Sequence, residues 1–291
     1  MKSAVSLLLL LLIAVALGIA QGQAPSTCTF RSLQIQTDYT SVYAINNQGA
    51  VAGSYTPPSS PQLGFVQLHG ALTKIQFPNA AYTNAYGIND NGIVVGSYAK
   101  TLMSAQQAFA WVNGKFIPLK YPGALATYAY GINVHNEIVG SYQDAQGVFH
   151  GFSYMSGTYT AIDFSGAQST LVTGINNNGE IVGAYTDSAN IEHGFLDQDG
   201  TFTVINYPGA ANTDLGAVND QGVVVGTFYD SSFSTWDGFV WINGAFREIS
   251  DPSAPTQTAV NGINSNGILV GNADYSGAGF VAAGCAPAPA Q

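Results

Sequence analysis

Hydrophobic and polar residues alternate over short stretches of this chain, and turn-forming residues separate one stretch from the next. Between residues 127 and 164, four such stretches follow one another, at 127–133, 137–142, 148–154 and 158–164. In the last of them, Tyr159 and Ala161 point to one side of an extended chain, and Thr160 and Ile162 point to the other. Alternation of this kind is typical of half-buried β-strands. We therefore predict four short strands in this segment.

The same unit recurs six times along the chain. An Ile-Asn or Val-Asn pair anchors each copy, at spacings of 43, 44, 43, 43 and 45 residues; the asparagines are Asn46, Asn89, Asn133, Asn176, Asn219 and Asn264. A small residue, Gly or Ala, precedes every pair, and a glycine stands seven positions after every asparagine. Repeats of this length with four strands have the size of a propeller blade.

Six such units predict an all-β fold, a six-bladed β-propeller with four antiparallel strands per blade over residues 28–285. Closing the sheets into a ring avoids long unpaired edges, which antiparallel sheets otherwise expose to aggregation. A linear β-solenoid is the alternative, although it would require distinct capping ends.

Turn residues support this assignment. The turn after each first strand starts at the repeated asparagine and ends in Gly in five copies and in Asn136 in the third. We expect this last residue to have a positive φ, and the leading asparagine to form an Asx-turn. A second tight turn, between the third and fourth strands, carries Gly70, Gly114, Gly157, Gly200 and Gly244.

The two ends of the repeat region predict how the ring closes. The sixth copy stops at its third strand, near Phe280, while residues 29–35 match the missing fourth strand. In the other copies, a glycine stands in the hairpin between the third and fourth strands. Cys285, five residues after Phe280, and Cys28, two residues before Phe30, both fall at the position of that glycine. We therefore predict that the N-terminal strand completes the last blade and that a Cys28–Cys285 disulfide clasps it.

The first twenty residues have the features of a secretory signal. Lys2 precedes an apolar stretch at 4–17, and the small residues Gly18 and Ala20 predict cleavage after Ala20. An uncleaved membrane anchor is the alternative, because the apolar stretch approaches the length of a membrane span. With cleavage, residues 21–27 form a short linker, residues 286–291 a flexible tail, and no membrane segment remains. The expected location is secreted, periplasmic or on the cell surface, where disulfides persist.

Charge is scarce in this chain. Its 7 basic and 17 acidic residues give a net charge of −10, and charged residues make up 8% of the sequence, against about 25% in a typical domain. So few Lys and Arg argue against nucleic acid as a partner. Strand interiors and Gly- or Asn-rich turns leave few positions for charge, so its scarcity mainly follows from the repeat.

The unit [Gly/Ala]-Ile-Asn-x-x-Gly, followed by Ile/Val-Val-Gly and His-Gly-Phe, resembles the bacterial extracellular repeats of the HAF family. The best matches are 174–183 with 193–195 and 131–140 with 150–152, and the resemblance extends over roughly residues 28–284. The chain departs from the family's His-Ala-Phe motif in two ways. Four copies lack the His and carry Leu63, Gln107, Asp237 and Ala278, and Gly replaces the Ala in most copies. The resemblance implies an exported repeat protein and no established activity.

Candidate ligand residues fall on one face of the predicted propeller. There, inter-blade links lie beside the loops between second and third strands, and this face carries Tyr121, Tyr142, Asp144, Tyr185, Asp187, Tyr207, Asp230 and Trp236. One interpretation is structural: the aromatics pack between blades and the aspartates cap turns. The other is functional: the aromatics stack on sugar rings, and the acidic loops bind cations or basic groups.

The six repeated threonines also have two interpretations; they are Thr40, Thr83, Thr127, Thr170, Thr213 and Thr258. Each hydroxyl satisfies a loop amide, or the six form a polar collar for an ion or water. We predict no catalytic residues and no metal site, because the four His, at 69, 135, 150 and 193, lack metal-ligand spacing. The sequence implies no cofactor. Binding of Ca²⁺ at the acidic loops is the one alternative that stays open.

The sequence therefore favours a monomeric, exported binding or interaction module. Its partner would be a neutral or cationic small molecule, a glycan, or another extracellular protein, held at the loop face. The alternatives are a glycan- or lactone-directed hydrolase or lyase that uses the same face, and a structural envelope protein. The regular spacing of Asp144, Asp187 and Asp230 argues for a repeated structural role, because active sites break symmetry.

Overall fold

The computed structural model describes residues 28–35, 39–58, 60–254, 257–273 and 277–286. Over these ranges the chain forms twenty-four β-strands and no helix. None of the described residues belongs to a helix that is long and apolar enough to cross a membrane. The predicted signal segment 1–20, the linker 21–27 and residues 287–291 of the predicted tail 286–291 lie outside the described residues. Ala286, the first residue of that tail, is buried in a core cluster.

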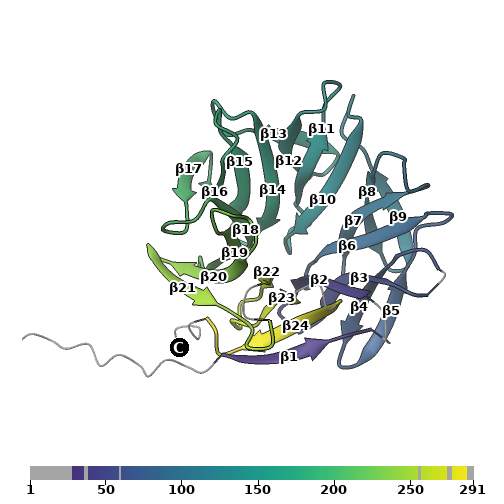
Figure 1. Ribbon diagram of the computed structural model, residues 1–291. Helices are drawn as coiled ribbons and strands as arrows, with labels where there is room; N and C mark the ends of the chain where they lie inside the picture. Colours follow the sequence, from purple (N-terminus) through teal and green to yellow (C-terminus); the bar gives the residue numbers. More distant parts are fainter. Residues whose placement is uncertain (1–27, 36–38, 59, 255–256, 274–276, 287–291) are drawn as a thin grey trace, which may run out of the picture.

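The strands form six antiparallel sheets of four strands each, and the sheets stand as blades around a central axis (Figure 1). This arrangement is the predicted six-bladed β-propeller. Within each of blades 1 to 5 the strands pair in chain order, from the inner strand at the axis to the outer strand at the rim.

The strand bounds are nearly the same from blade to blade. Blade 1 comprises β2 (Tyr39–Ile45), β3 (Val51–Thr56), β4 (Leu63–Leu68) and β5 (Ala71–Ile75); blade 2 comprises β6 (Tyr82–Ile88), β7 (Val94–Ala99), β8 (Gln107–Val112) and β9 (Lys115–Leu119). Blade 3 comprises β10 (Ala126–Ile132), β11 (Ile138–Gln143), β12 (Phe149–Met155) and β13 (Thr158–Ile162); blade 4 comprises β14 (Ser169–Ile175), β15 (Ile181–Thr186), β16 (Glu192–Gln198) and β17 (Thr201–Ile205). Blade 5 comprises β18 (Asn212–Val218), β19 (Val224–Tyr229), β20 (Trp236–Ile242) and β21 (Ala245–Ile249); blade 6 comprises β22 (Thr258–Ile263), β23 (Leu269–Ala273), β24 (Ala278–Ala283) and β1 (Thr29–Leu33).

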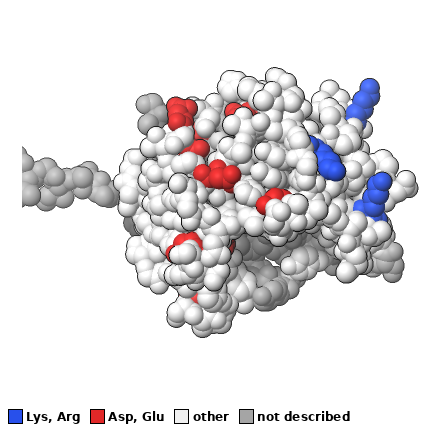
Figure 2. Space-filling view, turned by 90° about the horizontal axis from the view of Figure 1, so that it is seen from above, with Lys and Arg blue, Asp and Glu red and all other residues white. Residues whose placement is uncertain are grey.

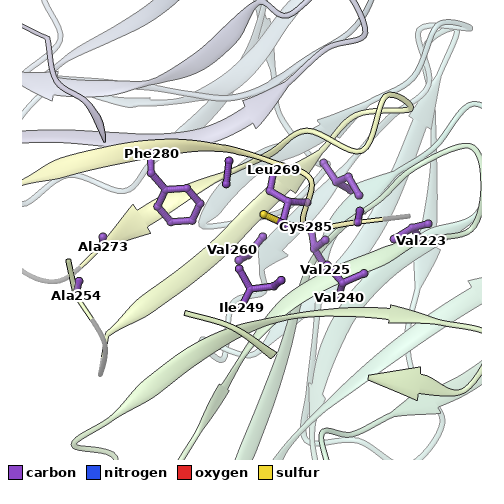
Figure 3. Close-up of a cluster of buried hydrophobic side chains, with 13 residues drawn as sticks. Val223, Val225, Val240, Ile249, Ala254, Val260, Leu269, Ala273, Phe280 and Cys285 are labelled. Atoms are coloured by element: carbon purple, nitrogen blue, oxygen red, sulfur yellow. The ribbon is translucent and has the colours of Figure 1, made fainter. Parts of the chain in front are cut away.

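The ring closes as predicted, because β1 pairs antiparallel with β24 and supplies the fourth strand of blade 6. Cys28 and Cys285 form a disulfide across this pair, with their Cα atoms 4.5 Å apart. Beneath it, Phe280 and Cys285 pack in a buried cluster with Leu269 of the same blade and Ile249 of blade 5 (Figure 3). The closure is therefore fixed by backbone pairing, a covalent bond and apolar packing together.

The turn residues also behave as predicted. Asn136 has a φ of 65° and Gly92 a φ of 73°, so both occupy the left-handed region. The hairpins between third and fourth strands have positive φ at both central residues, for example 49° at Asn113 and 80° at Gly114. Two positive φ values in a two-residue loop define a type I′ turn, whose twist matches that of the strands. The sequence predicted the glycine of this pair but not its partner.

The small residues that recur in every copy allow close approach of backbones. A Cβ atom on Gly131 would lie 3.1 Å from the Cα atom of Gly174 on the neighbouring inner strand, and one on Gly140 would lie 1.9 Å from the carbonyl oxygen of Tyr128. The first contact sets how tightly blades 3 and 4 pack at the axis, and the second sets the spacing within blade 3. Larger residues at either position would force the strands apart.

Each repeated asparagine makes two kinds of contact. The Oδ1 atom of Asn46 accepts hydrogen bonds from the N–H groups of Gln48 and Ala50, which is the predicted Asx-turn. The Nδ2 group of the same residue donates to the carbonyl oxygen of Asn89 in the next blade, at 3.1 Å. All six asparagines repeat the second bond, at 2.9 to 3.4 Å, and so form a closed ring.

Each inner strand also contains a β-bulge. The register of β2 against β3 shifts between Val42 and Ala44, which leaves Tyr43 as an extra residue. The other five inner strands shift at the equivalent place, and the six extra residues are Tyr43, Tyr86, Tyr130, Thr173, Gly216 and Asn261. All six line the central channel.

Candidate functional site

The eight candidate residues predicted from the sequence do not converge on one site. Tyr142 and Asp144 belong to blade 3, Tyr185 and Asp187 to blade 4, and Asp230 and Trp236 to blade 5, while Tyr121 and Tyr207 lie in inter-blade links. They form local arrangements that repeat from one blade to the next. A distinct site must therefore come from the positions where the blades differ.

The link aromatics pack against the following blade. The rings of Tyr121 and Tyr142 stack with their centroids 3.6 Å apart and an interplanar angle of 5°. Tyr207 stacks on Phe228 in the same way, at 3.7 Å and 3°. Burial, followed by a hydrogen bond with Tyr121, raises the pKa of the Tyr142 hydroxyl above its usual range. These contacts match the structural interpretation of the link aromatics, since one face of each link ring is already covered.

The loop aspartates cap their own turns. Asp144 Oδ1 accepts hydrogen bonds from the N–H groups of Gln146 (2.9 Å) and Val148 (2.8 Å). Asp187 and Asp230 make equivalent contacts in blades 4 and 5. The hydrogen bond from Val148 is the main reason why the pKa of Asp144 lies below its usual value. Each cap mainly uses Oδ1, which leaves Oδ2 for other contacts.

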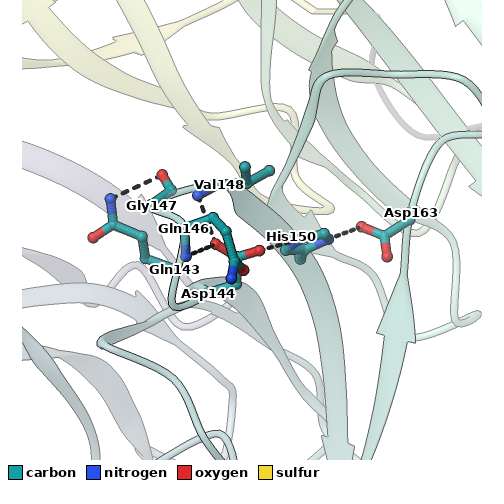
Figure 4. Close-up of polar contacts among 7 residues, drawn as sticks. All are labelled: Gln143, Asp144, Gln146, Gly147, Val148, His150 and Asp163. Carbon is teal, nitrogen blue, oxygen red and sulfur yellow. Dashed lines mark hydrogen bonds and ion pairs between the residues drawn. The ribbon is translucent and has the colours of Figure 1, made fainter.

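Two histidines use that second oxygen. His150 lies between two carboxylates, with Nε2 3.5 Å from Asp144 Oδ2 and Nδ1 3.0 Å from Asp163 Oδ1 (Figure 4). His193, in the equivalent position of blade 4, contacts Asp187 Oδ2 at 3.1 Å. Its other ring nitrogen faces the Asn206 amide at 2.9 Å. Blades 3 and 4 thus share the histidine but differ in its outer partner.

The motifs of the sequence did not point to Asp163 or Asn206 as partners of these histidines. Each lies thirteen residues after its histidine, near the end of the fourth strand. A signal was nevertheless present, because both occupy the same position of the repeat. A comparison of the copies at pairs of positions, rather than at single ones, would have found it.

A groove of about 270 Å³ lies at the junction of blades 3 and 4. Phe149, His150 and Asp163 line it from blade 3, and the link and first residues of blade 4, 164–170, complete it. Aromatic rings, a carboxylate, an imidazole and the hydroxyl of Ser169 therefore surround a single concave surface. This groove is the candidate functional site.

The threonine ring has a structural role. Each of the six hydroxyls accepts a hydrogen bond, at 2.9 to 3.1 Å, from a backbone N–H in the link before it; the donors are Ile35, Phe77, Tyr121, Phe164, Tyr207 and Asp251. The threonines are at most 2% exposed. The loop-amide interpretation is confirmed, and a collar open to ions is not formed.

A pair of carboxyl groups lies between blades 4 and 5 and was missed in the sequence. Asp214 on β18 and Glu192 on β16 lie close enough for their carboxyl groups to interact. Burial, and then the charge of Glu192, raises the pKa of Asp214 to about 7. Among the described residues, no group of three or more His, Cys, Asp or Glu side chains is placed to hold a metal ion.

Charge is distributed unevenly around the ring. Lys74, Lys100, Lys115 and Lys120 belong to blades 1 and 2 or to the link that follows. From residue 126 to residue 251 the chain is rich in Asp and Glu, and Arg247 is its one basic residue. Figure 2 shows basic side chains gathered at one end of the molecule and acidic ones over the rest of that view. The groove lies on the acidic part, which favours neutral or cationic ligands.

In sequence, no family model matches the chain and no curated protein matches it. Among solved structures, a putative TolB from Agrobacterium tumefaciens is similar with a TM-score of 0.58 and 13% identity, covering 76% of this chain and 87% of that one. A gluconolactonase from Xanthomonas campestris gives 0.56 and 10%, covering 91% of each chain. The SapL1 lectin in complex with alpha methyl fucoside gives 0.53 and 9%, covering 79% and 86%. At these identities the likeness shows the propeller fold alone.

Proposed function

We propose that this protein is an exported binding module that holds a small glycan, or a similar polyhydroxylated molecule, in the groove between blades 3 and 4. The proposal keeps the loop face predicted from the sequence and narrows it to one junction. The observation that carries it is the 270 Å³ groove with Phe149, His150 and Asp163 in its wall. Export is supported by the Cys28–Cys285 disulfide, because disulfides persist outside the cytosol. Membership of the HAF-repeat family is part of the proposal and is supported by the repeat motif.

The groove offers the chemistry that sugars require. Ligand sites combine apolar or aromatic surface with a few oriented polar groups. Here Phe149 and Phe164 supply the first, and His150, Asp163 and Ser169 supply the second. Asp144 contacts the far nitrogen of His150, at 3.5 Å, and so fixes the imidazole before any ligand arrives. Groups that are oriented in advance lose less entropy on binding.

The carboxyl pair does not favour the hydrolase alternative. Glycoside hydrolases place two carboxyl groups about 5–9.5 Å apart, with the sugar between them. Asp214 and Glu192 instead interact directly with each other. No substrate fits between groups in that contact, so the pair supports neither an acid–nucleophile nor an acid–base role. The fold that this chain shares with a lectin is compatible with binding, as analogy only.

A glycan array followed by calorimetry on the best-binding sugar tests the proposal. We expect His150→Ala and Asp163→Asn each to weaken binding about tenfold or more, as expected for lost charge-assisted hydrogen bonds. His193→Ala is the matched control, because His193 has the same loop environment but faces Asn206. Binding that survives Asp163→Asn and is lost with His193→Ala would place the site at another junction and overturn the assignment. An array without any bound glycan would overturn the ligand class.

A further inference from the structure

The six bulges give the central channel a set of side chains that the repeat does not fix. The bulge lies at the same place in every blade, and a small residue, Gly or Ala, follows it in all six copies. The extra residue itself is Tyr in blades 1 to 3 and Thr, Gly and Asn in blades 4 to 6. Bulges often re-aim a side chain beside a functional site. Side chains that differ from blade to blade on a backbone that stays the same are typical of positions that bind a ligand.

These residues divide the channel into two unlike halves. Tyr43, Tyr86 and Tyr130 stand on consecutive blades, and the centroid of the Tyr86 ring lies 5.0 Å from those of both neighbours. On the other side, Thr173, Gly216 and Asn261 are smaller, and a cavity of about 90 Å³ remains between the halves. A water needs about 10–15 Å³ of such volume, so the cavity has room for a small organic solute.

The cavity borders the asparagine ring at one end of the channel. Its far wall is an apolar belt that also borders the hollow inside that ring; the belt consists of Ile45, Ile88, Ile132, Ile175, Val218 and Ile263. Beyond the belt, the six asparagines bond to one another around the axis. The other end of the cavity lies towards the face that carries the links and the second-to-third loops.

The polar groups around the cavity are acceptors or neutral hydroxyls. Asn261 donates its Nδ2 group to the carbonyl oxygen of Val42, at 2.8 Å, which leaves its Oδ1 atom as an acceptor. No Lys or Arg is among the described residues that line the cavity. Two residues before Gly216 on β18, about 7 Å along the strand, lies Asp214, whose buried Oδ1 atom meets no hydrogen-bond donor. The whole arrangement is electron-rich and lacks a positive group of its own.

We propose that this channel cavity is a second binding site, separate from the groove, and that it takes a small organic ammonium ion. Aromatic rings attract cations through their quadrupole, and tyrosine is among the residues that do so well. On the opposite side, Asn261 adds an acceptor, and no basic side chain among the described lining residues repels a cation. The site does not depend on the proposed glycan groove, because the two share no lining residue.

Titration with tetramethylammonium chloride tests the proposal, with tert-butanol as a neutral probe of similar shape and sodium chloride to match ionic strength. We expect saturable binding of tetramethylammonium at one site and none of tert-butanol. Tyr130→Leu should weaken it about tenfold, the size of a desolvated cation–π contact, whereas Tyr130→Phe should keep most of it. Asp163→Asn, in the groove, should change nothing.

NMR of the wild-type protein with ¹³C-labelled tyrosine locates the site without any substitution. The Tyr43, Tyr86 and Tyr130 ring signals should shift on titration, while those of Tyr154 on the outer part of blade 3 should not. Equal binding of tert-butanol, shifts confined to Tyr154 or other outer tyrosines, or no saturation would each overturn the proposal. Because this readout needs no variant, it also decides the case in which Tyr130→Leu does not fold.

Discussion

The Nδ2 group of Asn264 donates a hydrogen bond of 3.0 Å to the carbonyl oxygen of Asn46, although the two residues lie 218 positions apart. It is the last of six equivalent bonds, each of which joins one blade to the next. The same asparagines cap their own turns through Oδ1. A single residue type therefore couples the local fold of every blade to the closure of the whole ring.

Replacing one of these asparagines should cost far more than a turn substitution normally does. Asn219→Ala would remove the acceptor for the N–H groups of Gln221 and Val223 and the donor to the Asn264 carbonyl. Leaving buried polar groups unpaired costs about 1–3 kcal/mol each, so we expect a loss of about 2–4 kcal/mol in urea denaturation. Gln221→Ala, in the exposed part of the same turn, should stay within about 0.5 kcal/mol. Equal effects of the two variants would contradict this role.

Reduction of the Cys28–Cys285 disulfide should loosen blade 6 before the other blades. The bond spans 257 residues, for which the chain-entropy model gives an upper limit of about 5 kcal/mol. We expect a lower melting temperature in reductant, and amide hydrogen exchange that accelerates in β1 and β24 more than in β10 to β13. A Cys28→Ser/Cys285→Ser variant should behave like the reduced protein. Unchanged exchange in β1 would show that strand pairing alone holds the ring.

The carboxyl pair predicts a stability that falls as pH rises. The pKa of Asp214 is raised from 3.8 to about 7 in the folded protein. The folded state therefore binds more protons between these values, and its advantage is lost as pH rises from about 4 through about 7. We expect the free energy of unfolding to be larger at pH 5 than at pH 8, and Asp214→Asn to flatten this difference.

Asp230 provides the opposite control for that experiment. Its hydrogen bonds, first of all from Ser232, lower its pKa. Its contribution is therefore lost only as pH falls towards the acid range, below the window in which Asp214 titrates. Asp230→Asn should leave the change between pH 5 and pH 8 intact. A wild-type protein equally stable at both pH values would contradict the raised pKa of Asp214.

The threonine hydroxyls should prove more important than their methyl groups. Thr127 is fully buried, and its Oγ1 atom accepts the N–H group of Tyr121 at 3.1 Å. Thr127→Val keeps the shape but leaves that N–H unpaired, at a cost of about 1–3 kcal/mol. Thr127→Ser keeps the acceptor and loses only a methyl group, so it should cost about 1 kcal/mol. Thermal denaturation of the two variants, side by side, measures the difference; a less stable Ser variant would reverse the assignment.

The propeller was predictable because its information is local and repeated six times. Turn glycines such as Gly92, the Asx-turn at Asn46 and the missing strand after Phe280 all report on backbone geometry that neighbouring residues determine. Even the disulfide followed from register within one hairpin. These signals add up across copies, so one irregular copy, such as that with Asn136, does not hide them.

The candidate sites were harder to predict because they depend on contacts between blades. Asp214 and Glu192 are 22 positions apart and meet only once blades 4 and 5 are packed side by side. The inward aim of Tyr130 depends on a bulge, which a residue pattern does not reveal. Residues that depart from the repeat form no pattern in the sequence. They are nevertheless the residues that distinguish one junction between blades from another.

The pairing of β1 with β24 also sets the order of events when the protein is made. The strand that contains Thr29 is synthesised before all the other described strands, yet its partner Ala283 lies more than 250 residues further along the chain. At about 5–20 residues per second, a stretch of this length takes about 10–50 s to synthesise. Blades 1 to 5 can therefore form before β24 is available to pair with β1. The ring closes only after β24 has been made, so a chain truncated before β24 is left open and exposes the edge of an unfinished sheet.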